Sequence, residues 1–315
     1  MQLRALVTSA LPQLQQVYPA DEAKAMLKRL LEDVCGLPWH LTVIEPEKDI
    51  PDTRANAVDQ MVRRLCAGEP LQYVIGWTVF CGRRFNVAPG VLIPRPETES
   101  LCQLVEMYAH GDSLTPPVHH PKILDLCTGS GCIAWTLSLD LKGASVTALD
   151  ISPEALAIAS SQNPLEVELS EDRPVPAKIL RRPAFLKADV LDPTTMEDFS
   201  DDFDFIVSNP PYVMNREKAL MRANVLEHEP HLALFVPDED PLLFYRAIAD
   251  WAMHCLRPGG RVLVEINEAL GPETAACFTA AGLQDAQVVN DLFDKARFVT
   301  ARRWTLQQNI PICTP

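Results

Sequence analysis

Apolar residues recur at helical spacing in three stretches near the start of the chain. The stretches cover residues 2–17, 20–35 and 53–67. The second begins with the acidic residues Asp21 and Glu22, which the positive end of a helix dipole favours in the first turn. The pattern therefore predicts a small helical domain over residues 1–70.

From residue 72 the pattern changes to one typical of strands. The run QYVIGWTVFCGRRFNVAPGVLIP, residues 72–94, is rich in β-branched and aromatic residues and has Gly82 where a turn fits. It predicts a β-hairpin. We expect residues 71–93 to link the helical domain to a larger domain over residues 94–315.

Beyond residue 94, short apolar runs alternate with helical patterns. Five runs predict strands at residues 122–127, 145–150, 184–189, 203–209 and 261–266. Helical patterns cover about 97–110, 131–140, 153–162 and 241–256. This alternation is typical of an α/β fold with a parallel, doubly wound sheet, here of order 3-2-1-4-5. Two closing runs, 287–291 and 297–303, lie five residues apart and predict a terminal hairpin, whereas the acidic stretch 164–183 predicts a surface loop.

Composition limits the class of protein. Of 315 residues, 47% are hydrophobic and 22% are charged, which is typical of a folded globular chain and not of a disordered one. No apolar stretch approaches the roughly 18 residues of a membrane span, and the N-terminal residues lack the features of a signal peptide. We therefore expect a cytoplasmic protein without membrane contact.

Charge and cysteine content argue against two kinds of partner. Residues 1–90 hold ten basic and ten acidic side chains, so the net charge of −14 arises after residue 90. A nucleic-acid binder usually has a basic face, so we expect no direct nucleic-acid contact. The nine cysteines are scattered without a CxxC pair, and residues 227–231 (EHEPH) match no common ligand spacing, so we expect no metal.

The first candidate for chemistry is a glycine-rich turn after the first predicted strand of the larger domain. Residues 123–127 (ILDLC) lead into Thr128-Gly129-Ser130-Gly131, and a helical pattern follows. Glycines let the backbone approach a ligand closely, and the N-terminus of a helix offers free N–H groups. Dinucleotide, phosphate and nucleoside sites all use such a turn, and a turn that serves packing alone has the same pattern.

Two acidic residues end the next two predicted strands. Asp150 lies 19 residues beyond Gly131, where a carboxylate accepts hydrogen bonds from both ribose hydroxyls, and this implies an adenosine moiety. Its alternative role is to cap the helix that begins near Pro153. Asp189 either places its carboxylate or the neighbouring Val190 amide near an adenine edge, or is a solvated acid at a strand end.

The fourth predicted strand runs directly into Asn209-Pro210-Pro211-Tyr212. Each proline fixes its own φ and restricts the residue before it, so this turn is stiff. The Asn209 side-chain oxygen and the Pro210 carbonyl can accept both hydrogens of one –NH₂ group, while the Tyr212 ring stacks on its face. Because strands one and four are neighbours in the predicted sheet, the two turns face each other. The pattern indicates methyl transfer from an adenosine-like donor to an amide or an exocyclic amine.

Four motifs resemble those of a known family. They are VLIPRPETE (91–99), LDLCTGSG (124–131), VSNPPY (207–212) and DLFDKARFVTARRW (291–304). With these motifs, and with GEPLQYVIG (68–76), nearly the whole chain resembles the HemK/PrmC family of release factor glutamine methyltransferases. The resemblance implies a Rossmann-like class I methyltransferase domain and a helical N-terminal domain that docks the protein substrate. It also implies S-adenosylmethionine as donor, S-adenosylhomocysteine as product, and N5-methylation of the glutamine in the GGQ loop of peptide chain release factors.

The resemblance also implies roles for single residues. The methionine and ribose parts of the cofactor would be held by Cys127, Thr128, Gly129, Ser130, Gly131 and Asp150, and the adenine by Asp189 and Val190. The substrate glutamine would be held by Asn209, Pro210, Pro211 and Tyr212, with Asn209 also beside the cofactor. Arg95 and Glu97 either line the cofactor pocket, which we expect, or pair on the surface. Cys127 departs from the common turn, which has a glycine there.

Three alternative functions stay open. A glutamine methyltransferase acting on a ribosomal protein shares the fold and the NPPY turn, but RPETE at 95–99 favours release factors. A DNA or RNA adenine N6-methyltransferase would use the same turn on a flipped base, together with a basic recognition region. A scaffold that binds partners through residues 1–70 would have a degraded cofactor pocket, whereas Gly129, Asp150 and Asn209 are present. We expect a monomeric enzyme.

Overall fold

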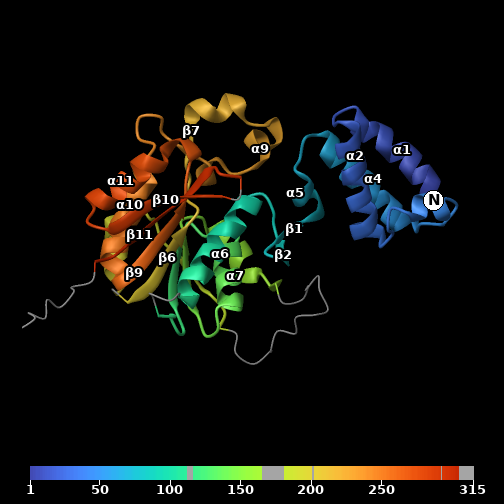
Figure 1. The fold of residues 1–315 in the computed structure, drawn as a ribbon. Coiled ribbons are helices and arrows are strands. Elements are labelled where there is room, and N and C mark those ends of the chain that lie inside the picture. The colour runs from blue at the N-terminus through green and yellow to red at the C-terminus, as the bar shows by residue number, and fades with distance from the viewer. Residues whose placement is uncertain (112–115, 165–180, 201, 292, 305–315) are drawn as a thin grey trace, which may run out of the picture. The chain divides into compact units, whose positions relative to one another are not determined.

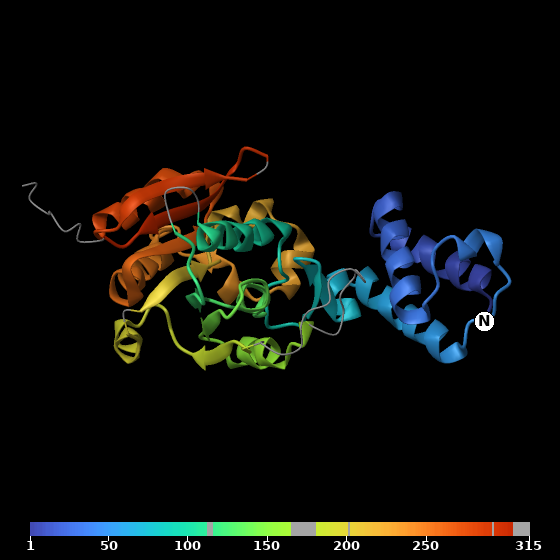
Figure 2. The ribbon, with the colours of Figure 1, turned by 60° about the horizontal axis from the view of Figure 1, so that its bottom comes forward.

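The computed structural model describes residues 1–111, 116–164, 181–200, 202–291 and 293–304 (Figures 1 and 2). The chain divides into two compact units. The first comprises Met1–Trp77, Val87–Pro89 and Met221–Glu229, and the second comprises the other residues. The domain limits expected from the sequence, 1–70, 71–93 and 94–315, stay a prediction.

The first unit is helical. Its helices are α1 (Leu3–Gln15), α2 (Ala20–Leu30), a π-helical turn (Leu31–Cys35), α3 (Leu41–Ile44), α4 (Asp52–Cys66), α5 (Leu71–Ile75) and α9 (Ala223–His228). The three helices predicted from periodicity are confirmed as α1, α2 with its π-helical turn, and α4. In α1 the residues that repeat every three or four positions, Leu3, Leu6, Ala10 and Leu14, are buried in one core.

The predicted hairpin is confirmed only in part. Strands β1 (Trp77–Phe80) and β2 (Arg83–Asn86) form a two-stranded sheet. The preceding residues, predicted as strand, are instead the short helix α5, which follows Pro70 and ends at Gly76 with φ +84°. A run of five residues (LQYVI) fits either state, and the burial of Tyr73 and Val74 in the helical unit selects the helix.

The second unit contains a seven-stranded sheet of order β10-β11-β9-β6-β3-β4-β5. The strands are β3 (Lys122–Leu126), β4 (Ser145–Asp150), β5 (Ala184–Lys187), β6 (Phe203–Ser208), β9 (Leu256–Glu265), β10 (Gln284–Asn290) and β11 (Ala296–Arg302). The first five are parallel in the predicted order 3-2-1-4-5, and β10 and β11 form the predicted antiparallel terminal hairpin. The fifth strand begins at Leu256, earlier than the predicted Arg261.

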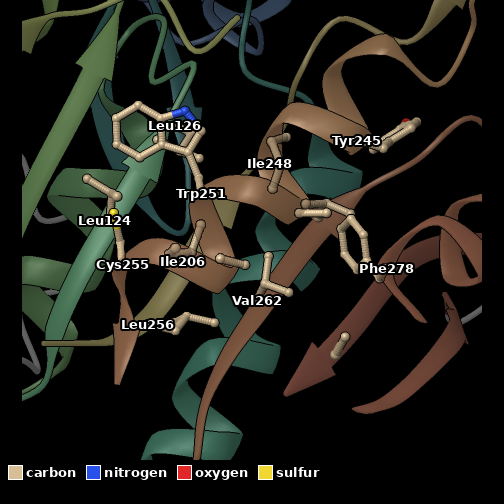
Figure 3. Packing of buried hydrophobic residues seen from close by; sticks show 14 of the residues in the cluster. Leu124, Leu126, Ile206, Tyr245, Ile248, Trp251, Cys255, Leu256, Val262 and Phe278 are labelled. Carbon is tan, nitrogen blue, oxygen red and sulfur yellow. The ribbon is translucent and has the colours of Figure 1, made fainter. Parts of the chain in front are cut away.

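Helices cover both faces of this sheet. They are α6 (Pro96–His110), α7 (Cys132–Asp140), α8 (Pro153–Ser161), α10 (Leu243–Cys255) and α11 (Gly271–Ala280). Alternate residues of the strands enter different cores. Leu124 of β3 belongs to the cluster that also contains side chains of α10 and α11, part of which Figure 3 shows, whereas Ile123 belongs to the cluster with α6 and α7. The fourth strand, β6, is buried along its whole length. A sheet covered on both sides leaves the ends of its strands as the place for a ligand.

The remaining elements of the second unit are short. Two-residue strands β7 (Val213–Met214) and β8 (Phe235–Val236) pair beyond the NPPY turn. The 3-10 helices are Pro193–Asp198, Asn215–Leu220, His231–Ala233 and Glu268–Leu270. Most of the predicted surface loop 164–183 lies outside the described residues. Within the described part of the chain, every helix is too short or too polar to cross a membrane.

Candidate active site

A cavity of about 390 Å³ lies at the carboxyl ends of β3, β4, β5 and β6. Strands β3 and β6 are parallel neighbours with Leu126 opposite Ser208, so the turns that follow them begin side by side. Ser208 strengthens this junction, since its hydroxyl donates to the Leu126 carbonyl at 2.7 Å. The predicted site residues that line the cavity are Cys127, Thr128, Gly129, Ser130, Asp150, Asp189, Val190, Asn209 and Pro211.

The two glycines of the turn after β3 have different surroundings. Gly129 has φ +55°, and a Cβ added there would meet no atom within 4 Å. Gly131 has φ +79°, and its added Cβ would lie 2.9 Å from the Cβ of Ala159 on α8. The resemblance implies that Gly131 contacts the cofactor, but Gly131 does not line the cavity. The first glycine therefore leaves room beside the cavity, and the second permits close packing of α7 and α8.

Cys127 occupies the position of the missing first glycine and has φ +59°. This left-handed conformation costs an L-residue roughly 1 kcal/mol or more. The thiol is half-buried and lines the cavity. Burial raises the pKa of the Cys127 thiol, with the charges of Asp150 and Asp125 adding to the rise, so the side chain is a neutral thiol at neutral pH.

The turn after β3 is fixed by hydrogen bonds to Asp125, to Gln162 and to the Leu149 carbonyl, none of which the sequence pattern marked. Thr128 donates from Oγ1 to Oδ2 of Asp125 at 2.6 Å and from its backbone N–H to the Leu149 carbonyl at 2.9 Å. Gln162 donates from Nε2 to the Ser130 carbonyl at 3.2 Å. Asp125 is fully buried, and this burial raises its pKa to about 7. The other carboxylate oxygen of Asp125, Oδ1, lacks a hydrogen-bond partner among the described residues.

Asp150 connects the end of β4 to the glycine turn. Its Oδ2 accepts from the Gly129 N–H at 2.8 Å, and its Oδ1 accepts from the Ser152 N–H at 2.9 Å. Burial raises the pKa of Asp150, while these backbone donors oppose the rise. The helix α8 is capped by Ser152, whose Oγ accepts from the Ala155 N–H at 3.1 Å, and not by Asp150 as the alternative required. Each carboxylate oxygen keeps a lone pair for a ligand.

Asp189 and Val190 follow β5 and line the same cavity. The Asp189 carboxylate accepts from the Leu191 N–H at 2.9 Å, a local turn that fixes its direction. The Val190 carbonyl accepts from Nε1 of Trp251 at 3.1 Å, which ties the segment to α10. Two hydrogen bonds therefore fix the segment, one within its own turn and one to α10.

The NPPY turn is fixed by contacts with distant parts of the second unit. Asn209 donates from Nδ2 to Oγ1 of Thr98 at 3.0 Å, and Thr98 donates to Oε2 of Glu265 at 2.7 Å. Tyr212 donates from its hydroxyl to Oε1 of Glu265 at 3.0 Å. Burial raises the pKa values of Tyr212 and Glu265. Of the four residues, Asn209 and Pro211 line the cavity, whereas Pro210 and Tyr212 do not.

The RPETE segment contributes one of the two expected residues to the cavity and one that was not expected. Arg95 lines the cavity, as expected, but Glu97 is outside the lining. Thr98, which lies between Glu97 and Glu99, lines the cavity and contacts Asn209. A threonine within a charged motif is easy to overlook, because its partner Glu265 is far away in the sequence. Among the described residues, we find no cluster of three or more His, Cys, Asp or Glu side chains that could hold a metal ion.

The charges of the cavity limit its ligand. Its charged lining residues are one basic side chain, Arg95, and three acidic ones, Asp150, Glu154 and Asp189. Most other lining residues are apolar, among them Val91, Leu92 and Ile133. An excess of acidic groups disfavours a pyrophosphate and favours a neutral or cationic ligand. The cavity therefore suits a neutral or cationic ligand better than a dinucleotide with its pyrophosphate.

Comparison with known proteins shows similarity over both units. A family model described as "PrmC N-terminal domain" matches residues 5–76, and one described as "Methyltransferase small domain" matches residues 112–233. The release factor glutamine methyltransferase of Bacteroides thetaiotaomicron is 41% identical over 92% of this chain and 96% of its own length. That of Flavobacterium psychrophilum is 36% identical over 91% of this chain and 94% of its own length.

A solved structure is also similar to this chain. It is a protein-(glutamine-N5) methyltransferase (release factor-specific) from Alicyclobacillus acidocaldarius, with 25% sequence identity and a TM-score of 0.39. The match covers 70% of this chain and 100% of the other.

Proposed function

The chain belongs to the release factor glutamine methyltransferase family, and from this premise we propose that it methylates N5 of the glutamine in the GGQ motif of a peptide chain release factor. The proposed methyl donor is S-adenosylmethionine. The observation that carries the proposal is that the glycine turn after β3 and the NPPY turn after β6 border one cavity, through Gly129 and Asn209. A donor held by one turn and an amide held by the other would then meet.

The cavity residues fit this donor. Asp150 would accept hydrogen bonds from the ribose hydroxyls, because both of its oxygens are directed by backbone donors and keep free lone pairs. The open space at Gly129 admits close approach of the ligand to the backbone, and Asp189 with Val190 would contact the adenine. The acidic excess suits the positive charges of the donor. When bound, S-adenosylmethionine supplies an electrophilic methyl carbon attached to a sulfonium.

The NPPY turn would prepare the acceptor nitrogen. An amide nitrogen is a poor nucleophile because its lone pair is delocalised into the carbonyl. The Asn209 Oδ1 and the Pro210 carbonyl would accept the two N–H groups, which orients the nitrogen and stabilises the positive charge that develops on it. The Tyr212 ring would stack on the amide plane. Pro210 and Tyr212 lie outside the cavity lining, so their two contacts with the amide stay a prediction. After transfer the nitrogen is strongly acidic and loses its proton to solvent, so these residues need no general base.

The helical unit would dock the protein substrate, as the match of residues 5–76 to the PrmC N-terminal domain supports. Translation termination takes place in the cytoplasm, so the proposal implies that location.

Incubation with labelled S-adenosylmethionine and a purified release factor tests the proposal. We expect one methyl group on the glutamine of the GGQ peptide, located by mass spectrometry, and none on a release factor in which that glutamine is replaced by alanine. A ribosomal-protein extract and methyl-free DNA and RNA serve as competing acceptors. Label on one of these, with none on the release factor, would overturn the proposal.

A further inference from the structure

Two side chains of the NPPY turn are connected to the same buried carboxylate. The oxygens of Glu265, at the end of β9, accept from Thr98 at 2.7 Å and from Tyr212 at 3.0 Å. Glu265 and Thr98 are each 2% exposed. Asn209 is one step further away, bonded to Thr98 at 3.0 Å. Neither Thr98 nor Glu265 belongs to the turn itself.

The chemistry of these groups fixes the direction of every hydrogen bond in the network. Both oxygens of Glu265 accept, and Thr98 gives its single hydroxyl hydrogen to one of them. The Thr98 oxygen is then available only as an acceptor, and Asn209 must present its –NH₂ group to it. The Asn209 Oδ1 is on the other branch of the planar amide and is left for the cavity. The carboxylate thus sets the orientation of an amide that it does not touch.

We propose that Glu265, acting through Thr98, is a positioning residue that keeps the side-chain oxygen of Asn209 directed at the substrate nitrogen. The inference rests on the proposed function, because it assigns Asn209 to the acceptor amide. A reversed Asn209 would direct an –NH₂ group at the substrate –NH₂ group and so lose a hydrogen bond. It would instead match an oxygen, and the turn would no longer distinguish glutamine from glutamate.

The fold holds the backbone of Glu265 without help from its side chain. Glu265 pairs with Phe298 of β11 in the antiparallel register, and its carbonyl accepts from the Tyr245 hydroxyl at 3.4 Å. Burial raises the pKa of the Glu265 carboxyl, and the hydrogen bonds from Thr98 and Tyr212 oppose that rise. A buried carboxyl group is costly unless such donors are present. A purely structural role would be met more cheaply by an apolar residue of similar size.

Substitution of Thr98 tests the inference. Thr98→Val keeps the shape but cannot accept from Asn209. We expect kcat for the release factor to fall roughly 10- to 100-fold, with the dissociation constant for S-adenosylmethionine changed by less than about 2-fold. Thr98→Ser restores the hydroxyl and is expected to recover most of kcat. The matched control is Thr136→Val on α7: Thr136 is fully buried, and its hydroxyl lacks a partner among the described residues, so kcat stays at the wild-type value.

A second readout does not depend on activity. In protein labelled with [¹⁵N]asparagine, the side-chain –NH₂ signal of Asn209 is identified by its absence in Asn209→Ala. We expect slow hydrogen exchange of this group in the wild type and in Thr98→Ser, and fast exchange in Thr98→Val. Should Thr98→Val fail to fold, Thr98→Ala removes the same hydroxyl without adding a methyl group.

The outcomes separate the two proposals. Wild-type kcat in Thr98→Val, or equal losses of kcat in Thr98→Val and Thr98→Ser, overturns the positioning role. Slow exchange of the Asn209 signal in Thr98→Val overturns it as well. An inactive wild-type protein, with the expected exchange pattern in the variants, counts against the release factor as substrate and supports the network.

Discussion

Beside each of the two turns at the cavity, a threonine hydroxyl donates to a buried carboxylate, but the sequence separation of the two residues differs greatly between the turns. In the glycine turn, Thr128 donates to the buried carboxylate of Asp125, three residues away. At the NPPY turn, Thr98 donates to the buried carboxylate of Glu265, 167 residues away. The threonine and the carboxylate of the first turn lie in one segment, although Asp150 and Gln162 also bond to that turn from further along the chain. The second pair needs α6 and β9 to be in place. The buried carboxylate that supports the first turn thus comes from the strand just before it, whereas the one that supports the second depends on the assembled sheet.

The largest expected effect concerns Asp125, the buried carboxyl group that accepts from Thr128 of the glycine turn. Its pKa of about 7 means that folded Asp125 keeps its proton after the unfolded chain has lost it. The unfolded state therefore binds fewer protons between roughly pH 4 and pH 7, and Asp125 lowers the free energy of unfolding by about 1.4 kcal/mol per pH unit there. Above pH 7 this contribution is constant. Urea unfolding across this range should show the slope in the wild type but not in Asp125→Asn.

The slope is read as the difference between wild type and Asp125→Asn, because other groups titrate in both proteins. Parallel curves would show that Asp125 is ionised in the folded protein.

The next effect concerns the NPPY turn. Asn209→Ala removes a preorganised acceptor of the substrate amide, and we expect kcat to fall on the order of 10²-fold or more. Calorimetric binding of S-adenosylmethionine should change little. Asn215→Ala is the control, since Asn215 is exposed and lies outside the cavity lining. Full activity of Asn209→Ala would remove Asn209 from the mechanism.

The fold was largely predictable because its signals are local and periodic. The order of the five parallel strands and the terminal hairpin followed from alternating apolar patterns. Helix α5 was missed because five residues (LQYVI) carry no distinct period, and only their packing decides between helix and strand. Leu256 was not recognised as the first residue of β9 because the residues that follow it, 257–260 (RPGG), are typical of a turn.

The candidate site was predictable where a residue lies at the end of a predicted strand or directly after it. Gly129 and Asp150 were recognised because each follows a strand at a spacing that implies a ligand. Thr98, Gln162 and Glu265 were missed, because each acts on a residue at least 32 positions away and no short pattern marks such a pair. Residues at strand ends were thus recognised from the sequence, whereas the supporting residues Asp125, Gln162 and Glu265 became evident only in the structure.

A smaller effect separates the two glycines of the first turn. In Gly131→Ala the new Cβ would lie 2.9 Å from Ala159 on α8 and 3.2 Å from Phe185 on β5, so both neighbours would have to shift away from it. We expect the free energy of unfolding to fall by roughly 2 kcal/mol. In Gly129→Ala the new Cβ meets no atom within 4 Å and only the left-handed strain at φ +55° remains, so the free energy of unfolding should fall by about 1 kcal/mol while the affinity for S-adenosylmethionine falls. Urea unfolding and calorimetry measure the two quantities, and the reverse assignment would contradict the roles given to the glycines.

The smallest effect tests the cysteine in place of the first glycine. Cys127→Ala and Cys127→Gly both remove the sulfur, but only alanine keeps a Cβ at φ +59°. The glycine variant should therefore be more stable than the alanine variant, by up to about 1 kcal/mol, because the left-handed strain of roughly that size exceeds the entropy that glycine adds to the unfolded chain. Urea unfolding of the two variants gives the difference directly. An alanine variant as stable as the glycine variant would mean that the turn accepts a side chain at position 127 without strain.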